Sequence, residues 1–224
     1  MYCGTRGEVT DDHVPPRSFY GKIPPNNLIK VPACEPCNQG FGQIDDYVRF
    51  VLVTTENKES RTRKELIPTV RRFAEREESK RVLESFYGSL ETGYMQNDKG
   101  AFVERQRFEV DGARMDAFAV RLVKAVFYRE KGYRLPAGYV VKPMHYRQLP
   151  VIEAMIGERD FWPFIIAQLD QSPNRQRWGD VFAYSWVQSP SDLNATWWLL
   201  SLYDRAQYLC STWNMALAEK WPRG

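Results

Sequence analysis

Short stretches of alternating apolar and polar residues predict the β-strands of this chain, because successive side chains of a strand point to opposite faces. The first such stretch begins at residues 8–10 and continues into Asp12 and His13, and the second covers residues 28–31. Prolines directly after Val14 end the first strand, since proline lacks an amide donor. Later strands are expected as a hairpin over 94–110 with its turn at 97–100, a strand over 181–187, and a hairpin of 196–203 and 207–213.

Helical spacing of apolar residues appears in other regions. The most regular helix is expected to start at Asp111 and Gly112 and to stop at Gly132, a residue that often ends helices. Its apolar face carries Met115, Ala119, Leu122, Val123 and Val126. Further helices are expected after Gly40, with Ile44, Tyr47, Val48 and Val51 on one side, over 68–90 with Pro68 in the first turn, and over 150–169 with an interruption at Pro163.

These elements predict an α+β fold. The first part has the order strand, loop, strand, helix and extends to about residue 56. Residues 54–64 are polar and charged, as in a linker or an exposed helix end. Residues 57–224 then form a second domain that mixes helices with an antiparallel sheet.

Composition and charge restrict the function only weakly. With 224 residues, 43% of them hydrophobic, the chain can bury a substantial core. A net charge of +3 permits a nucleic-acid partner without requiring one. No apolar run approaches the ~20 residues of a membrane helix, and no leader peptide is visible, so we expect no membrane partner and a cytoplasmic location.

The residues best suited to chemistry lie in the first sixth of the chain. Asp12 offers a hard oxygen ligand for an ion such as Mg²⁺, and the adjacent His13 has a pKa suited to a general base. Asn26 and Asn27 both occur in a turn-like segment, and Asn27 is preferred because it directly precedes Leu28. Asn38 can add a neutral oxygen ligand.

Cysteines accompany these residues at a spacing typical of metal sites. Cys34 and Cys37 form a Cys-x-x-Cys pair, and Cys3 lies near the start of the chain. Few cysteines in a chain of this length favour metal binding in a reducing compartment over a disulfide framework. Cys210 is too distant in sequence to be assumed a ligand.

Together, these motifs resemble those of the HNH nucleases, which have the ββα-metal fold. The resemblance rests on Cys3-Gly4, Asp12-His13-Val14-Pro15-Pro16, Asn27-Leu28 and Cys34-x-x-Cys37-Asn38, and it covers roughly residues 1–50. Within that family, the segment is most similar to the zinc-knuckle variant that carries a C-terminal extension. It implies that residues 1–56 are a nuclease module that cleaves DNA and leaves 5′-phosphate and 3′-hydroxyl ends.

The resemblance also implies a role for each matching residue. Asp12 and Asn38 would hold a catalytic divalent ion, Mg²⁺ or Mn²⁺, and His13 would be the general base. Asn27 would brace the loop and help to orient the histidine. The cysteines that would hold a structural Zn²⁺ are Cys3, Cys34 and Cys37.

One departure from the family pattern concerns the zinc site. A tetrahedral structural zinc has four ligands, usually from two Cys-x-x-Cys pairs, but the partner of Cys3 would lie before Met1. Three alternatives remain: a start that is trimmed or misassigned, a zinc held by three cysteines and a substitute, or a knuckle without metal.

Basic residues on the helix that starts near residue 112 are candidates for binding nucleic acid. A polar face opposite the apolar one would carry Arg114, Arg121, Lys124 and Arg129. Such a face can contact phosphates without reading the sequence, or it can simply be solvated.

The sequence therefore predicts a metal-dependent HNH endonuclease acting on DNA, in a setting such as restriction or phage defence. The alternative is a zinc-stabilised module that binds nucleic acid or protein, with a nuclease site that is inactive or gated by a partner. Residues 57–224 would position DNA, form a homodimer or bind another protein.

Overall fold

The structure is a computed structural model, and it describes residues 1–4, 8–21, 24–55, 60–97, 99–145, 161–204 and 206–218. The chain divides into two compact units. Unit 1 comprises residues 1–45 and 115–224, and unit 2 comprises residues 46–114. The sequence predicted a functional module over residues 1–56, whereas residues 1–45 belong to the same compact unit as the C-terminal half; the functional boundary stays a prediction.

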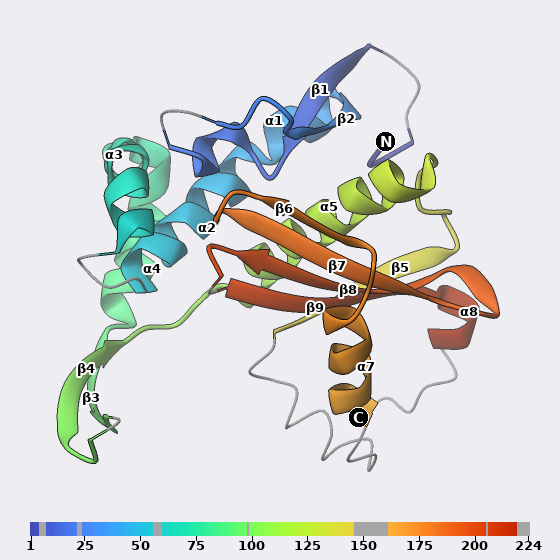
Figure 1. Cartoon of the computed structure of the whole chain (residues 1–224). Helices are drawn as coiled ribbons and strands as arrows, with labels where there is room; N and C mark the ends of the chain where they lie inside the picture. Colours follow the sequence, from blue (N-terminus) through green and yellow to red (C-terminus); the bar gives the residue numbers. More distant parts are fainter. Residues whose placement is uncertain are drawn as a thin grey trace. The chain divides into compact units, whose positions relative to one another are not determined.

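A five-stranded antiparallel sheet forms the centre of unit 1 (Figure 1). Its strand order is β5-β9-β8-β7-β6, so that β8 is central and β5 and β6 are the edges. The strands are β5 (Tyr139–His145), β6 (Arg175–Trp178), β7 (Phe182–Ser189), β8 (Asp192–Leu202) and β9 (Ala206–Asn214), and a short helix, α8 (Met215–Ala218), follows β9.

Helices pack on both faces of this sheet. On one face, Phe127 of α5 (Gly112–Lys131) contacts Trp198 of β8, with 6.5 Å between the ring centroids. On the other face, α7 (Phe161–Asp170) buries Leu169 against the neighbouring strand residues Trp197 and Leu199. Because Trp197 and Trp198 are adjacent in a strand, their side chains point to opposite faces. The alternation of buried residues in β8 therefore produces a core on each side of the sheet.

An N-terminal hairpin belongs to the same unit. β1 (Val9–Val14) pairs antiparallel with β2 (Ile29–Cys34), and the 3-10 helix η1 (Arg17–Phe19) lies between them in sequence. The hairpin buries the face that carries Val14, Ile29 and Val31, as the period of two requires. α1 (Glu35–Gly40) and α2 (Gly42–Thr55) follow β2 directly.

The hairpin segment is attached to the rest of unit 1 through side chains distant in sequence. Phe19 stacks on Phe118 of α5, with centroids 5.5 Å apart. The Trp178 Nε1–H of β6 donates to the Asn27 carbonyl oxygen at 2.8 Å, and the Tyr203 hydroxyl donates to the Phe19 carbonyl oxygen. The first 45 residues are therefore part of one core with residues 115–224.

Unit 2 contains most of α2, then α3 (Arg61–Ala74), the 3-10 helix η2 (Glu77–Ser79), α4 (Lys80–Gly88), and a hairpin of β3 (Glu91–Gln96) and β4 (Phe102–Arg107). Aromatic rings join its helices: Phe50 of α2 contacts Phe73 of α3 and Phe86 of α4. Asp46 accepts from Arg76 at 2.7 Å and also pairs with Arg49.

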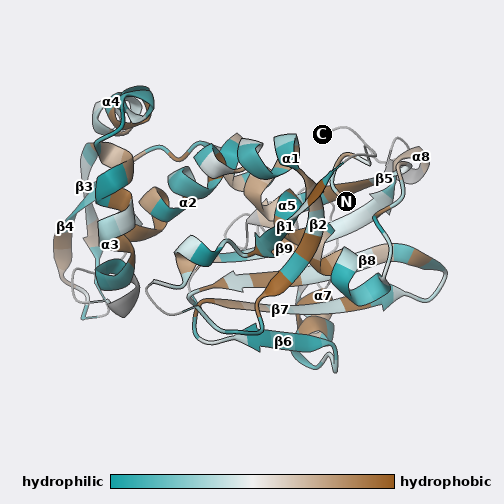
Figure 2. Ribbon diagram, turned by 90° about the horizontal axis from the view of Figure 1, so that it is seen from above, coloured by the Kyte–Doolittle hydropathy of each residue, from teal (hydrophilic) through white to brown (hydrophobic). Residues whose placement is uncertain are grey.

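The predicted α+β class with antiparallel sheets is confirmed, while several element boundaries differ. Pro68 lies inside α3, which starts seven residues earlier, where the Ser60 hydroxyl caps the Arg63 amide. Two edge strands, β5 and β6, were not predicted. β6 is almost entirely hydrophilic, whereas β2 and β8 alternate (Figure 2). Residues 150–160 of the helix predicted over 150–169 lie outside the described residues, and the rest belongs to α7.

None of the helices in the described ranges combines the length and the apolar character needed to cross a membrane.

Candidate functional site

Three cysteines meet where the N-terminal segment passes the end of the first hairpin. Cys34 is the last residue of β2, Cys37 lies in the first turn of α1, and Cys3 lies near the start of the chain. The Sγ atoms of Cys3 and Cys34 are 3.4 Å apart, and the three sulfurs lie within 4.8 Å of one another. Among the described residues, no other group of three or more His, Cys, Asp or Glu side chains is this close together.

This geometry fits a bound metal ion. Zn–S bonds of about 2.3 Å at tetrahedral angles would place the sulfurs about 3.8 Å apart, a spacing this cluster can adopt with small side-chain movements. Burial raises the pKa of Cys37 to about 11, because it disfavours the charged thiolate, and the neighbouring thiols of Cys34 and Cys3 add to this shift. Three cysteines are therefore close enough to hold a metal ion.

Asp12 is buried and forms a two-pronged ion pair with Arg121 of α5. The side chains of both residues are 3% exposed. The Arg121 Nη2–H donates to Asp12 Oδ1 at 2.5 Å, and the Arg121 Nε–H donates to Asp12 Oδ2 at 3.1 Å. The Tyr2 hydroxyl also donates to Asp12 Oδ2, at 2.6 Å. Both carboxylate oxygens of Asp12 are thus occupied by donors of the protein itself.

Asp45 and Phe41 complete the surroundings of Arg121. The third guanidinium nitrogen, Nη1, donates to Asp45 Oδ1 at 2.6 Å, and the guanidinium carbon lies 4.2 Å from the centroid of the Phe41 ring. Burial by itself would lower the pKa of Arg121, but Asp45 and Asp12 raise it overall. Burial and the Asp12 carboxylate raise the pKa of Tyr2. The arginine therefore stays charged and the tyrosine stays protonated throughout the physiological pH range.

This network bears on the roles that were predicted for Arg121 and Asp12. Arg121 was expected on an exposed basic face, but it is buried and paired with two carboxylates, so it is not available to phosphates. Asp12 was expected to ligate a catalytic divalent ion, and its oxygens already accept from Arg121 and Tyr2. The arrangement described here does not fit a Mg²⁺ ion on Asp12.

His13 lies on the opposite face of the hairpin from Asp12, because the two residues are adjacent in β1. It is half-buried and lies opposite Lys30 in the pairing of β1 with β2. Partial burial lowers the pKa of His13, and the charges of Lys30 and Arg17 lower it further, outweighing Asp11 and Asp12. At neutral pH the imidazole is therefore uncharged and able to accept a proton.

The two predicted asparagine positions lie on either side of β2. Asn27 is exposed, and its carbonyl oxygen accepts from Trp178, so its backbone ties the turn before β2 to the large sheet. Asn38 lies in α1, and its Nδ2–H donates to the Thr10 hydroxyl at 3.0 Å. Thr10 and Asp12 share one face of β1, so Asn38 and Asp12 belong to the same side of the hairpin.

The remaining basic candidates each have a different environment. Arg129 lies over the Trp178 ring at 5.4 Å, and Lys124 is half-buried on α5. Arg114 belongs to unit 2, where it pairs with Asp111 at 3.1 Å. Whether these three side chains bind nucleic acid stays a prediction.

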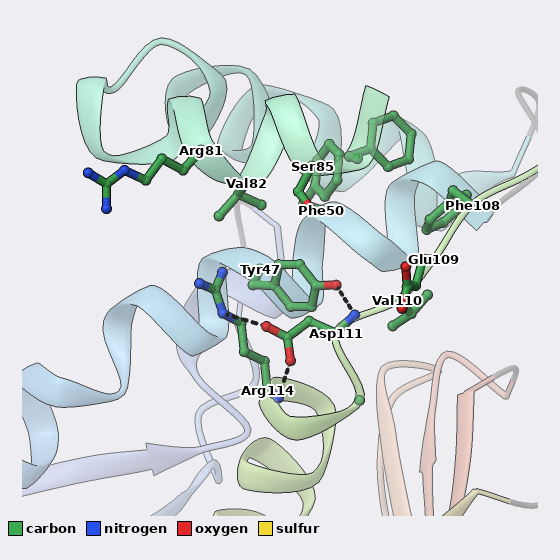
Figure 3. A pocket seen from close by; sticks show the side chains of 12 residues that line it. Tyr47, Phe50, Arg81, Val82, Ser85, Phe108, Glu109, Val110, Asp111 and Arg114 are labelled. Atoms are coloured by element: carbon green, nitrogen blue, oxygen red, sulfur yellow. Dashed lines mark hydrogen bonds and ion pairs between the residues drawn. The ribbon is translucent and has the colours of Figure 1, made fainter. Parts of the chain in front are cut away.

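Unit 2 has a pocket of its own, shown in Figure 3. It has a volume of about 440 Å³ and lies between α2, α4 and the segment that leads into α5. The Tyr47 hydroxyl accepts from the Asp111 amide at 2.6 Å, and Arg114 lies 5.1 Å from the centroid of the Tyr47 ring. Arg114 and Asp111 form an ion pair in its lining, and none of the predicted catalytic or metal-binding residues lines it.

The sequence did not identify Tyr2 and Asp45 as members of the buried network around Asp12. Asp45 and its neighbour Asp46 lie near the start of a helix, where the helix dipole favours acidic residues even without a charged partner. Arg121, the partner of Asp12 and Asp45, lies more than 70 residues away from each of them on α5, and no local sequence pattern indicates such a contact.

Comparison of the chain with protein-family models, with curated proteins and with solved structures found no match.

Proposed function

We propose that this chain is an HNH-type endonuclease that hydrolyses DNA phosphodiester bonds, with His13 as the general base. The observation that carries the proposal is the environment of His13. An uncharged imidazole lies on the outer face of the hairpin, opposite Lys30, and partial burial and the charges of the exposed Lys30 and Arg17 lower its pKa. Cations beside a proton acceptor favour the approach of a phosphate group to that acceptor.

The chemistry follows from this environment. The His13 imidazole accepts a proton from water, and the water oxygen forms a bond to phosphorus. The bond from phosphorus to the 3′ oxygen then breaks, and that oxygen takes up a proton to become a hydroxyl group. Lys30 and Arg17 offset the negative charge that builds up on the phosphoryl oxygens.

A structural zinc on Cys3, Cys34 and Cys37 is part of the proposal. It would fix the N-terminal segment to β2 and α1, and so hold the hairpin that carries His13. HNH-type enzymes also use a divalent ion, which stabilises the leaving oxygen when it is bound. Asp12 does not offer this ion an open oxygen in the present arrangement.

A second candidate is a zinc-stabilised module that binds nucleic acid or protein and whose nuclease site is gated by a partner. The ion pair of Asp12 with Arg121 favours it, because a carboxylate held by two guanidinium nitrogens and a tyrosine cannot ligate a metal until one of them moves. In this version a bound partner would shift the equilibrium toward an arrangement in which Asp12 is free.

Plasmid cleavage by the purified full-length chain tests the proposal. Reactions with Mg²⁺, Mn²⁺ or EDTA compare wild type with His13→Ala, and His145→Ala is the matched control because the chain has two histidines. We expect wild type and His145→Ala to nick or linearise the plasmid only with metal. His13→Ala should lose about 10²–10⁴-fold in rate while keeping its DNA affinity.

The other outcomes distinguish the two candidates. A His13→Ala protein with full activity would contradict the role of His13. Intact plasmid in every reaction would favour the gated or binding module, provided that bound zinc is confirmed. In that case the protein should bind DNA equally well with and without Mg²⁺. A search for the partner that restores cleavage would then follow, with restriction and phage defence as the proposed settings.

A further inference from the structure

The hairpin of β3 and β4 is a two-stranded sheet with very little of its own surface buried. No third strand pairs with it in the described part of the chain (Figure 1). Its large apolar side chains are exposed: Phe102 by 73%, Tyr94 by 70% and Met95 by 63%. Isolated two-stranded hairpins are marginally stable in water, and three or more strands are usually needed. This hairpin therefore gains most if a further strand pairs with one of its edges.

The register of the hairpin determines which backbone groups are free at each edge. The Asn97 amide donates to the Ala101 carbonyl oxygen at 2.8 Å, next to the pair of Gln96 with Phe102. In an antiparallel ladder, hydrogen-bonded and non-hydrogen-bonded pairs alternate. On β3 the amides that point away from β4 are consequently those of Thr92, Tyr94 and Gln96.

Charges protect one edge and leave the other open. β4 carries Glu104, Arg105 and Arg107 among its six residues, and charged side chains on an edge discourage further pairing. β3 carries one charged residue, Glu91, which lies at its start and already accepts from Arg107 at 2.7 Å. The β3 edge is therefore the one open to another strand.

We propose that the β3 edge pairs with the β3 edge of a second copy of this chain, antiparallel about a two-fold axis at Tyr94. The two hairpins would then form one four-stranded sheet. Tyr94 would lie opposite Tyr94 of the second copy, with both backbone hydrogen bonds exchanged between them. Thr92 would lie opposite Gln96 of the second copy, so all three outward amides of each strand would find acceptors.

The side chains on β3 are compatible with this symmetry. Two tyrosines that face each other across an antiparallel pair can stack, and Met95 would cover Gly93 of the second copy, a large residue over a small one. No like charges oppose each other. The equivalent pairing through β4 would place Glu104 opposite itself, or Arg105 opposite itself one position further along, and like charges directly opposite are destabilising.

Sedimentation of the full-length protein tests the proposal with a matched pair of variants. Tyr94→Pro removes an outward amide on β3, and Glu104→Pro removes the outward amide of its register partner on β4. Neither amide takes part in the hairpin itself, and proline is tolerated at such edge positions. Over about 1–100 µM we expect wild type and Glu104→Pro to approach twice the 26.2 kDa chain mass. Tyr94→Pro should stay a monomer or raise Kd at least about ten-fold.

Lysine substitutions provide a second pair that leaves every backbone group in place. Tyr94→Lys would put two like charges at the two-fold axis, yet it can pair with Glu104 within its own hairpin, so it should dissociate the dimer without unfolding β3. Glu104→Lys should leave the dimer intact. A wild-type protein that is monomeric over the whole range, or dimers of Tyr94→Pro and Tyr94→Lys as tight as wild type, would overturn the proposal.

Discussion

At the scale of single residues, Arg121 carries a buried charge that matters for the stability of its surroundings. Its three guanidinium nitrogens bind Asp12 and Asp45, and its guanidinium carbon lies 4.2 Å from the centroid of the Phe41 ring. A buried ion pair need not be strongly stabilising as a whole, but removing one member leaves the other charge buried and unpaired. The network is therefore far more sensitive to single changes than to coordinated ones.

We expect Arg121→Leu to lower the free energy of unfolding by about 3–5 kcal/mol, because two carboxylates lose their counter-charge in a buried site. Chemical denaturation followed by tryptophan fluorescence measures the change. Lys30→Ala is the control, since the exposed pair of Lys30 with Asp11 should contribute less than about 1 kcal/mol. Adding Asp12→Asn to Arg121→Leu should recover part of the loss. A loss as small as that of Lys30→Ala would contradict this account of the network.

The environment of His13 predicts how the stability of the fold depends on pH. Burial, Lys30 and Arg17 lower its pKa below the ordinary value of 6.5, so the folded state binds this proton less readily than the unfolded state. The contribution of the neutral imidazole to the free energy of unfolding is present above pH 6.5 and is lost as the pH falls through the folded-state pKa. If His13 is the base, cleavage should also persist below pH 6.5.

NMR titration of the imidazole protons measures this pKa directly, and His145→Gln identifies the signal of His13. Lys30→Met should raise the pKa of His13 toward its ordinary value, because it removes a neighbouring positive charge. A His13 signal that titrates above 6.5 in the wild type would be inconsistent with the environment described here.

At the scale of elements, the cysteine cluster joins three segments: the start of the chain, the end of β2 and the first turn of α1. α1 is six residues long and buries none of its residues, and Cys3 is exposed. A metal ion on the three sulfurs would couple these segments to β2, because binding energy at such sites contributes to folding.

We expect the purified protein to contain one zinc per chain, and Cys37→Ser to lose most of it. Chelation should lower Tm by about 5–10 °C, since the stabilising ligand is removed from the folded state. Elemental analysis and thermal unfolding measure both effects. Cys210→Ala, which changes the buried cysteine of β9, should keep its zinc. Full zinc content in Cys37→Ser would contradict the assignment of the site.

The elements that could be predicted from sequence are those with a strong apolar period. α5 buries Phe118, Leu122 and Val126 on one face, and the observed helix spans 112–131 as expected. The edge strands could not be predicted in the same way. β5 contains Pro143 and β6 reads Arg-Gln-Arg-Trp, and such residues are tolerated only because an edge strand has one side without a partner.

At the scale of the whole chain, unit 1 is assembled from two segments separated by 69 residues of unit 2. Periodicity along the sequence identifies elements but not their long-range partners. Neither the contact of Phe19 with Phe118 nor the bond from Trp178 to Asn27 has a local signal. The separate N-terminal module was predicted from a resemblance that covers only about residues 1–50.

We therefore expect residues 1–56 not to fold when produced alone, even with zinc, because Arg121, Phe118 and Trp178, which contact Asp12, Phe19 and Asn27, all lie beyond residue 114. Circular dichroism and NMR dispersion of this fragment measure the outcome, with the full-length chain as the reference. A fragment with a well-dispersed spectrum and cooperative unfolding would show that the module is autonomous after all.

The ion pair of Arg121 with its two aspartates also has an evolutionary consequence. Each single replacement passes through a protein with an uncompensated buried charge, so these three positions should rarely change one at a time. Among related sequences we expect Asp12, Asp45 and Arg121 to be retained together or replaced together by uncharged residues of similar total volume. Tyr2 should follow the same pattern, since its hydroxyl is useful only while the Asp12 carboxylate is there to accept from it.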